Sequence, residues 1–419
     1  MQLKSILNRV EKIPGFVFKE CRWCERSERI EVVVEPRKNS RPRCSVCGKA
    51  APLYGRQGQR AFDYVPLWQI PVVLLYTMRR VNCGSCGVRV EKVPWATGKT
   101  RSSSTYLWFL AIWAKRLSWS EVAETFGTSW QTVCRAVEHA VSWGRQHVDL
   151  SQIRSIGVDE LLHRRGSKAH GGPKYLTLVY QIDQHRKRLL WIGYDRTQAT
   201  LNSFFDWFGK ERSEALNVVC SDMWPAYLKV LRERATKAMR IIDRFHVSAN
   251  INKAIDRIRA AESRELTRSG KKVLIHSRFL FLHRKENLSE SQHEKLGAIL
   301  KMNLRIVRAY LLKESFRRFW DFQSRGWARR FLEGWIDRVM RSRLEGLKRV
   351  ARTFRQHLEL LLNSVVTKDV AMGAVEGFNN KANVTIRKSY GFRSFRIAEL
   401  ALYHSLADLP QPDFTHRFW

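Results

Sequence analysis

Two Cys-x-x-Cys pairs in the first quarter of the chain constrain its fold more than any other feature. Each pair is followed directly by a glycine, and strand-like apolar segments separate the two pairs. Two thiolate pairs can fill a tetrahedral zinc site when a tight turn places both sulfurs of a pair on one metal. The pattern predicts a zinc ribbon within residues 1–100, and four buried thiols without a metal are the alternative. The predicted ligands are Cys44, Cys47, Cys83 and Cys86.

The other cysteines give weaker signals. Cys21 and Cys24 form a third pair, but no glycine follows it, and a lone pair cannot close a tetrahedral site. Whether this pair binds a metal stays open at this point. Cys134 and Cys220 are predicted to be core residues. Met1–Pro14 lacks the apolar centre of a secretory signal, and without export paired cysteines indicate a metal site rather than disulfides.

The charge of the chain indicates its partner. Lys and Arg number 75 against 39 Asp and Glu, which gives +36 with neutral histidines. Such a charge opposes a compact state unless an anion relieves it. The positive charge runs along the whole chain, so nucleic acid is the expected partner.

A hydrophobic content of 44% argues against disorder. The longest apolar stretches reach only about half of a bilayer span, so we expect a cytosolic protein without membrane contact.

Residues 101–150 have the pattern of three short helices. Ser118 and Glu121 are spaced as a capping box at the start of the second helix, and Gly127 ends that helix. A further helix from Trp130 completes the pattern of a DNA-binding helix-turn-helix, with a plain three-helix connector as the alternative. Four side chains near its start could contact bases and phosphates. They are Ser129, Gln131, Thr132 and Arg135.

The remaining chain changes its hydrophobic period twice. Residues 151–250 contain five strand-like stretches, three in a meander and two alternating with helices, which predicts a mixed α/β sheet. Residues 251–362 are predicted to be almost wholly helical, and aromatic and cationic residues alternate near 316–330. That alternation favours contacts with DNA phosphates and bases, with a solvated amphipathic bundle as the alternative. The five strand-like stretches within residues 151–250 are Ser155–Leu162, Lys174–Ile182, Arg188–Tyr194, Leu216–Asp222 and Arg240–Val247.

Three acidic residues are unusual in their surroundings. Asp159 lies within an apolar strand, Asp222 ends another, and Glu376 opens a late helix. A carboxylate in an apolar strand carries a desolvation penalty unless a cation or hydrogen bonds compensate it. If the three converged, they could hold two Mg²⁺ ions and promote phosphoryl transfer. Their spacing alone does not show convergence, and surface or capping roles are the alternative.

The order of these motifs resembles that of bacterial insertion-sequence transposases of the DDE type, most closely the ISL-three family. Gly157-Val-Asp159-Glu160 is similar to the family's first catalytic acid, and Ser221-Asp222-Met-Trp-Pro-Ala-Tyr227 to its second. The most specific likeness lies in Gly373-Ala-Val-Glu376-Gly-Phe-Asn-Asn-Lys381 with Arg387-Lys-Ser-Tyr-Gly391-Phe-Arg393. Asp243-Arg-Phe-His246 is similar to a signature of related transposases whose RNase H-like core is interrupted by a helical insertion. The chain departs from the family after Lys381, where it has Ala382-Asn383-Val384.

The resemblance implies an architecture. The chain would be a multidomain α/β protein in which an RNase H-like mixed sheet is interrupted by an all-helical insertion. The N-terminal zinc-binding and helix-turn-helix domains would recognise the terminal inverted repeats of the element. The parts are a zinc-binding domain (1–100), a helix-turn-helix (101–150), the first part of the catalytic core (151–250), the helical insertion (251–362) and the C-terminal part of the core with the third acid (363–419).

The resemblance also implies a mechanism. Asp159, Asp222 and Glu376 would bind two Mg²⁺ ions that activate water to cut the element's end and then activate the new 3′-hydroxyl to attack target DNA. His246 would steady the scissile phosphate, unless it is a core histidine, and Lys381 and Arg387 would contact phosphates. A nucleoid-associated bacterial protein, acting as a dimer or larger assembly on DNA, is expected. The alternatives are a non-catalytic or domesticated regulator that binds DNA, and a nuclease or resolvase without strand transfer.

Overall fold

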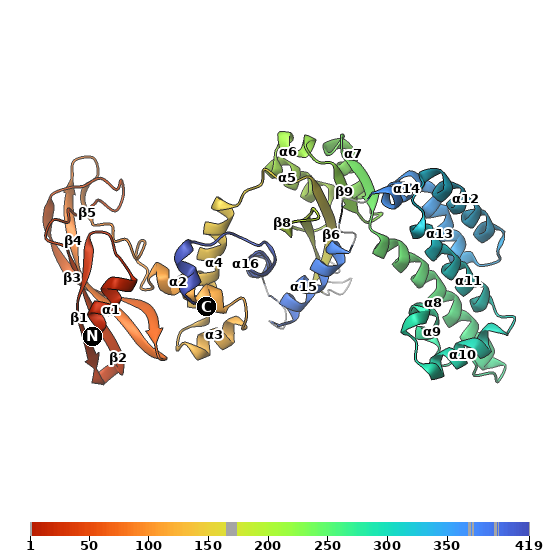
Figure 1. Ribbon diagram of the computed structural model, residues 1–419, viewed down its shortest axis with the longest axis horizontal. Helices are drawn as coiled ribbons and strands as arrows, with labels where there is room; N and C mark the ends of the chain where they lie inside the picture. Colours follow the sequence, from red (N-terminus) through yellow and green to blue (C-terminus); the bar gives the residue numbers. More distant parts are fainter. Residues whose placement is uncertain are drawn as a thin grey trace. The chain divides into compact units, whose positions relative to one another are not determined.

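The computed structural model describes residues 2–164, 174–367, 370, 373–388, 392 and 394–418 (Figure 1). The chain forms two compact units, which are described separately below. One comprises Met1–Val148 with Thr385–Trp419, and the other comprises Asp149–Val384. The predicted mixed α/β class is confirmed, because each unit combines a five-stranded mixed sheet with helices. None of the described helices has the length and apolarity that a membrane span requires.

The first unit begins with a twisted sheet of order β1-β2-β4-β3, with β5 paired to β4. Apart from the parallel pair β2/β4, its strands are antiparallel. The core beneath it includes Phe62, Leu74 and Trp95, and the Trp95 ring contacts three other aromatic rings edge-on. The elements are α1 (Leu3–Val10), β1 (Phe16–Cys24), η1 (Glu25–Ser27), β2 (Arg29–Pro36), β3 (Leu53–Leu67), β4 (Ile70–Cys83) and β5 (Gly87–Val90).

Three helices follow in the first unit, as predicted: α2 (Ser104–Trp113), α3 (Trp119–Thr125) and α4 (Trp130–His147). The capping box of Ser118 and Glu121 is present at the start of α3. Gly127 has φ +57° in the turn to α4, a conformation that favours glycine. Helix α16 (Phe395–Leu406) packs against α4, and η5 (Asp413–Phe418) follows it.

The sheet of the second unit has the order β10-β9-β6-β7-β8. β6, β7 and β8 form an antiparallel meander, whereas β9 and β10 run parallel to β6. Phe204, Phe208 and Tyr227 are fully buried in the core between this sheet and its helices. The elements are β6 (Ser155–Arg164), β7 (Lys174–Ile182), β8 (Lys187–Tyr194), α5 (Gln198–Phe208), α6 (Lys210–Glu214), β9 (Val218–Ser221), α7 (Pro225–Arg234) and β10 (Met239–Ile242).

A long helical segment leaves β10 and returns to it (Figure 1). It has a core of its own around the fully buried Trp335, and its helical character was predicted correctly. The hydroxyl of Ser364 accepts from Ile242 N–H (2.9 Å) and donates to the Ile242 carbonyl (3.0 Å), so the two ends of the segment are joined. The elements are α8 (Arg244–Arg268), α9 (Arg278–Leu282), η3 (Lys285–Asn287), α10 (Glu290–Leu300), α11 (Arg305–Arg317), η4 (Arg318–Asp321), α12 (Arg325–Arg341), α13 (Glu345–Gln356) and α14 (Leu358–Val366).

One predicted strand needs correction. The stretch Arg240–Val247 is extended only as far as Ile242, and helix α8 begins at Arg244. The carboxylate of Asp243 accepts a hydrogen bond from Phe245 N–H (2.9 Å) and so caps the new helix. The predicted strand was too long because the apolar run continues from the last strand residues to Val247, the first buried position of the helix. His246 therefore lies in the first turn of a helix and not on a strand.

Candidate functional site

Three aspartates lie at one edge of the sheet of the second unit. In the parallel register, Val158 of β6 pairs with Ser221 of β9, and Ser221 pairs with Ile242 of β10. The next residue along each strand direction is an aspartate. Because in-register residues of parallel strands share a face of the sheet, the three carboxylates start from neighbouring backbone positions. They are Asp159, Asp222 and Asp243.

Two of these aspartates meet His246. One ligand atom each from Asp159, Asp243 and His246 lies within 4.8 Å of those of the other two. The Nε2 atom of His246 is 3.4 and 3.5 Å from the two carboxylate oxygens of Asp159. Asp243 and His246 are three residues apart at the start of α8, a spacing that brings side chains together on a helix.

The charges of this cluster favour a cation. Burial alone would lower the pKa of His246, but the hydrogen bond with Asp159 and the charges of the aspartates raise it to about 9. Burial raises the pKa of Asp222 to about 6 and also raises that of Asp243. The Oδ2 atom of Asp243 is buried and accepts no hydrogen bond from the described residues. Carboxylate oxygens with unused acceptor capacity are suitable ligands for a hard cation such as Mg²⁺.

Asp222 and Glu376 lie outside this 4.8 Å group but within electrostatic range of it. The half-buried Asp222 accepts a hydrogen bond from Trp224 N–H at 3.0 Å, and its charge acts on His246. Glu376 lies in the first turn of α15 (Ala374–Lys388), and its charge raises the pKa of Asp243. Of the four predicted catalytic residues, the structure thus brings Asp159 and His246 into contact and places the other two nearby.

Two contacts bring the start of α15 against β6. A Cβ atom on Gly157 would lie 2.5 Å from Cγ2 of the buried Val375, so only glycine admits the helix at this distance. Further along, the amide of Asn379 donates to Oδ2 of Asp159 and accepts from the Tyr180 hydroxyl (2.8 Å). Asn379 thereby connects the helix that carries Glu376 to the carboxylate of Asp159.

Asp243 and Asn379 were not among the predicted site residues. The sequence holds a signal for Asp243, because it directly follows an apolar strand just as Asp222 does. Asn379 lies within the motif Gly373–Lys381, but its contact with Asp159 depends on the packing of a helix against a strand 220 residues earlier in the chain.

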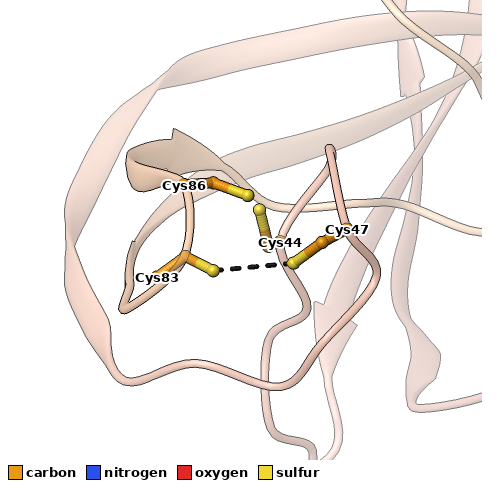
Figure 2. A group of neighbouring side chains, drawn as sticks. All are labelled: Cys44, Cys47, Cys83 and Cys86. Carbon is orange, nitrogen blue, oxygen red and sulfur yellow. Dashed lines mark hydrogen bonds between the residues drawn. The ribbon is translucent and has the colours of Figure 1, made fainter.

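The four predicted zinc ligands come together at the end of the first unit's sheet. The Sγ atoms of Cys44, Cys47, Cys83 and Cys86 lie within 4.8 Å of one another and point toward a common centre (Figure 2). The sulfurs of Cys47 and Cys83 are 3.6 Å apart. The glycine after each pair has φ +70°, as a tight turn requires. The cluster is compatible with a zinc ribbon.

The electrostatics of this cluster also suit a metal. Backbone N–H groups of Cys47 and Val46 lower the pKa of the Cys44 thiol to about 7, and the N–H of Ser85 contributes to lowering that of Cys83. Thiolates are the form that binds zinc, and these donors stabilise them. The hydrogen bond with Cys47, burial, the hydrogen bonds with Cys44 and Cys83 and the charge of Cys47 raise the pKa of Cys86 to about 12, because a further thiolate in this group would meet a like charge. A divalent cation at the centre would relieve this repulsion.

The third cysteine pair has a different geometry. Cys21 and Cys24 lie in the continuous strand β1, where residues three apart point to opposite faces. Cys21 packs toward the sheet's core, and the Cys24 sulfur contacts the Ser27 hydroxyl at 3.1 Å. In this conformation the two sulfurs cannot bind the same ion.

The predicted DNA-contacting residues of α4 lie at its start. Gln131 and Arg135 are exposed, and Thr132 is half-buried. The Ser129 hydroxyl accepts from Thr132 N–H (3.2 Å) and so caps the helix, and it lies 2.9 Å from the Thr132 hydroxyl. Gln131 and Arg135 are therefore the two side chains of this set that best extend from the helix toward a DNA surface.

The remaining predicted contacts lie on α15. Lys381 is exposed, with its ammonium 5.8 Å from the centre of the Phe378 ring, and Arg387 is exposed near the end of the helix. Four residues of the motif that follows, Ser389, Tyr390, Gly391 and Arg393, lie outside the described residues.

Comparisons with known proteins show which family the chain resembles. A protein-family model described as "Transposase", of the DDE type and the ISL3 group, matches residues 156–401, which include Asp159, Asp222, His246 and Glu376. The chain is 27% identical over 357 residues to the transposase of insertion sequence element IS1001 from Bordetella parapertussis, covering 84% of this chain and 85% of that protein. It is 29% identical over 394 residues to the transposase of element IS1557 from Mycobacterium tuberculosis, covering 87% and 86%.

Proposed function

Because the chain belongs to the ISL3 family of insertion-sequence transposases, we propose that it cuts and joins DNA at the acid cluster of its second unit. The observation that carries the proposal is the register of three parallel strands, from which Asp159, Asp222 and Asp243 start at neighbouring backbone positions, with His246 next to Asp159 and Asp243. The sheet order, with an antiparallel meander followed by two parallel strands, supports an RNase H-like core.

The acids would hold the metal, and their chemistry fits it. Asp159, Asp222 and Glu376 are the proposed ligands of two Mg²⁺ ions, with Asp243 next to them. Two such ions, when bound, stabilise charge on the attacking and leaving oxygens of a phosphoryl transfer. Such ions would bind the carboxylates of Asp222 and Asp243, whose pKa values burial raises, and the Oδ2 atom of Asp243 without a hydrogen bond is open to them.

The surrounding residues position the DNA strand. His246, whose Nε2 atom lies beside the Asp159 carboxylate, would donate a hydrogen bond to an oxygen of the scissile phosphate. Lys381 and Arg387 are proposed phosphate contacts on α15. The N-terminal zinc ribbon and the helix-turn-helix over α3 and α4 would bind the terminal inverted repeats. Since two element ends must be joined, the active form on DNA would be a dimer or larger, in the bacterial cytoplasm at the nucleoid.

The test is the variant Asp222→Asn, compared with Asp206→Asn on the surface of the same unit, where the side chain of Asp206 is 67% exposed. Loss of a metal ligand removes several kcal/mol of transition-state stabilisation, which corresponds to about 10³-fold in rate. Asp222→Asn should bind duplexes of the element's end as the wild type does but lose Mg²⁺-dependent nicking, measured on labelled strands. Full cleavage by Asp222→Asn would overturn the acid assignment, and DNA binding by a wild type that never cleaves would favour the regulator.

A further inference from the structure

Arg196, in the turn between β8 and α5, joins three parts of the second unit. Its guanidinium carbon lies 4.0 Å from the centre of the Tyr175 ring on β7 and 4.7 Å from that of Trp224, between β9 and α7. Its Nη1 atom donates to both carboxylate oxygens of Glu160 on β6, at 3.0 and 3.1 Å. The side chains of Arg196 and Glu160 are only 31% and 23% exposed. One guanidinium group therefore connects two strands with the loop that contains Asp222.

The backbone next to Arg196 is strained. Asp195 has φ +77°, a left-handed conformation that residues with a Cβ atom adopt rarely and that persists only where the surroundings hold it. Here β7 holds it, because Asp195 N–H donates to the Tyr175 carbonyl (2.9 Å) and the Asp195 carbonyl accepts from the Thr177 hydroxyl (2.6 Å). Strain of this kind is concentrated at functional sites. The strand thus fixes the backbone from which the guanidinium group reaches Trp224.

Trp224 in turn holds the carboxylate of Asp222. Its N–H donates to Oδ1 of Asp222 at 3.0 Å, which is the one hydrogen bond that this carboxylate accepts from the described residues. The carboxylate of Asp159, by contrast, meets the side chains of His246 and Asn379. The orientation of the Asp222 carboxylate therefore depends on the backbone of Trp224, and the Trp224 ring depends on its neighbours.

We propose that Arg196 is a positioning residue for the cleavage reaction. By holding the Trp224 ring, it fixes the loop whose backbone N–H orients the Asp222 carboxylate, so that this proposed metal ligand keeps one orientation. Arg196 itself touches neither the metal nor the DNA strand. This inference rests on the proposed function, because it takes Asp222 as a ligand. Outer-shell partners of metal ligands typically contribute about 10- to 100-fold in metal affinity or activity.

An ordinary surface ion pair is the alternative, and another arginine of the same unit provides the comparison. Arg234, at the end of α7, pairs with Asp206, and its guanidinium carbon lies 5.8 Å from the centre of the Phe205 ring. Its side chain is 36% exposed, close to the value for Arg196. No contact among the described residues joins Arg234 to the loop of Asp222. Exposed pairs of this kind contribute little to stability, so Arg234 is a matched control.

The experiment compares Arg196→Gln with Arg234→Gln in the full chain. Arg196→Gln should nick labelled duplexes of the element's end about 10- to 100-fold more slowly and should bind those duplexes as the wild type does. Its affinity for Mn²⁺, measured without DNA from the paramagnetic resonance of the free ion, should fall by a similar factor. Arg234→Gln should match the wild type in each measurement.

Two substitutions of Trp224 separate position from charge. Trp224→Leu removes the ring but keeps every charge, so it should slow nicking as Arg196→Gln does. Trp224→Phe keeps a ring for the guanidinium group and should restore most of the rate. Because Arg196 acts through Trp224, the double variant Arg196→Gln/Trp224→Leu should be no slower than either single variant, whereas independent effects would multiply.

The outcomes distinguish the inference from the proposed function. Wild-type nicking and Mn²⁺ affinity in Arg196→Gln, or multiplied effects in the double variant, would overturn the inference and leave the proposed function intact. If Arg196→Gln did not fold, wild-type nicking by Trp224→Leu would overturn the inference equally. A wild type that cleaves no end DNA would overturn the proposed function, and the inference with it.

Discussion

The cysteine cluster and the acid cluster are built in opposite ways. The four sulfurs come from two tight turns at one end of a sheet, and the buried core around them is small. The acids and His246 come from three strands and two helices and rest on the extensive core of the second unit. We therefore expect the fold around the cysteine cluster to depend on its bound metal. The fold around the acid cluster should form without a metal and hold the ligands in place for it. Substitutions should separate these two dependences.

The largest effect is expected from Cys83→Ser in the cysteine cluster. Structural zinc contributes about 10–16 kcal/mol of apparent binding free energy in zinc-finger peptides, and little apolar contact replaces it here. The variant should lose its zinc and expose the ends of β4 and β5, while the second unit stays folded. Zinc content and protease cleavage near residue 86 would be measured. Cys134→Ser on α4 is the control, and a full zinc complement in Cys83→Ser would contradict the assignment.

A smaller effect is expected from Asn379→Ala in the acid cluster. Asn379 is a positioning residue, since it holds the Asp159 carboxylate and is itself held by Tyr180. Removing such a partner of a metal ligand typically costs about 10- to 100-fold in metal affinity or activity. The Mg²⁺ concentration for half-maximal nicking should rise, with an unchanged melting temperature. Asn383→Ala, one turn along α15, is the matched control, and an unchanged Mg²⁺ dependence for Asn379→Ala would refute the positioning role.

The third substitution, Gly157→Ala, is expected to act through the packing of α15 on β6. The added methyl group would press on the stiff, buried Val375, and overpacking of this kind costs about 1–3 kcal/mol. The start of α15, with Glu376, should shift and lower the cleavage rate. Gly297→Ala in α10 meets no atom within 4 Å and should slightly stabilise the protein. Thermal melting and nicking rates would be compared, and wild-type values for Gly157→Ala would show that α15 does not pack as described.

These two clusters also differ in how far they could be predicted. The cysteine ligands follow from local spacing, because each pair and its glycine turn are adjacent in the chain. The acids needed a sheet order and a register, which the residues alone do not specify, and so Asp243 was not among the predicted site residues. The strand predicted through His246 was wrong because a side-chain cap, and not a change in hydrophobicity, ends β10. Most helices and strands outside β1 and β3 could be predicted from their apolar periods.

The hydroxyl of Ser364 has a consequence for how such a chain can evolve. It joins the departure and the return of a segment across a separation of 122 residues, at a single point on the edge of β10. The closure entropy of a loop rises by only about 0.6 kcal/mol for each doubling of its length. The segment between could therefore lengthen, shorten or be exchanged over generations without moving a strand, provided that its two ends still meet. Evolution can therefore add or remove a whole helical module between β10 and Ser364. By contrast, the insertion of a single residue within β6 would turn Asp159 to the opposite face of the sheet.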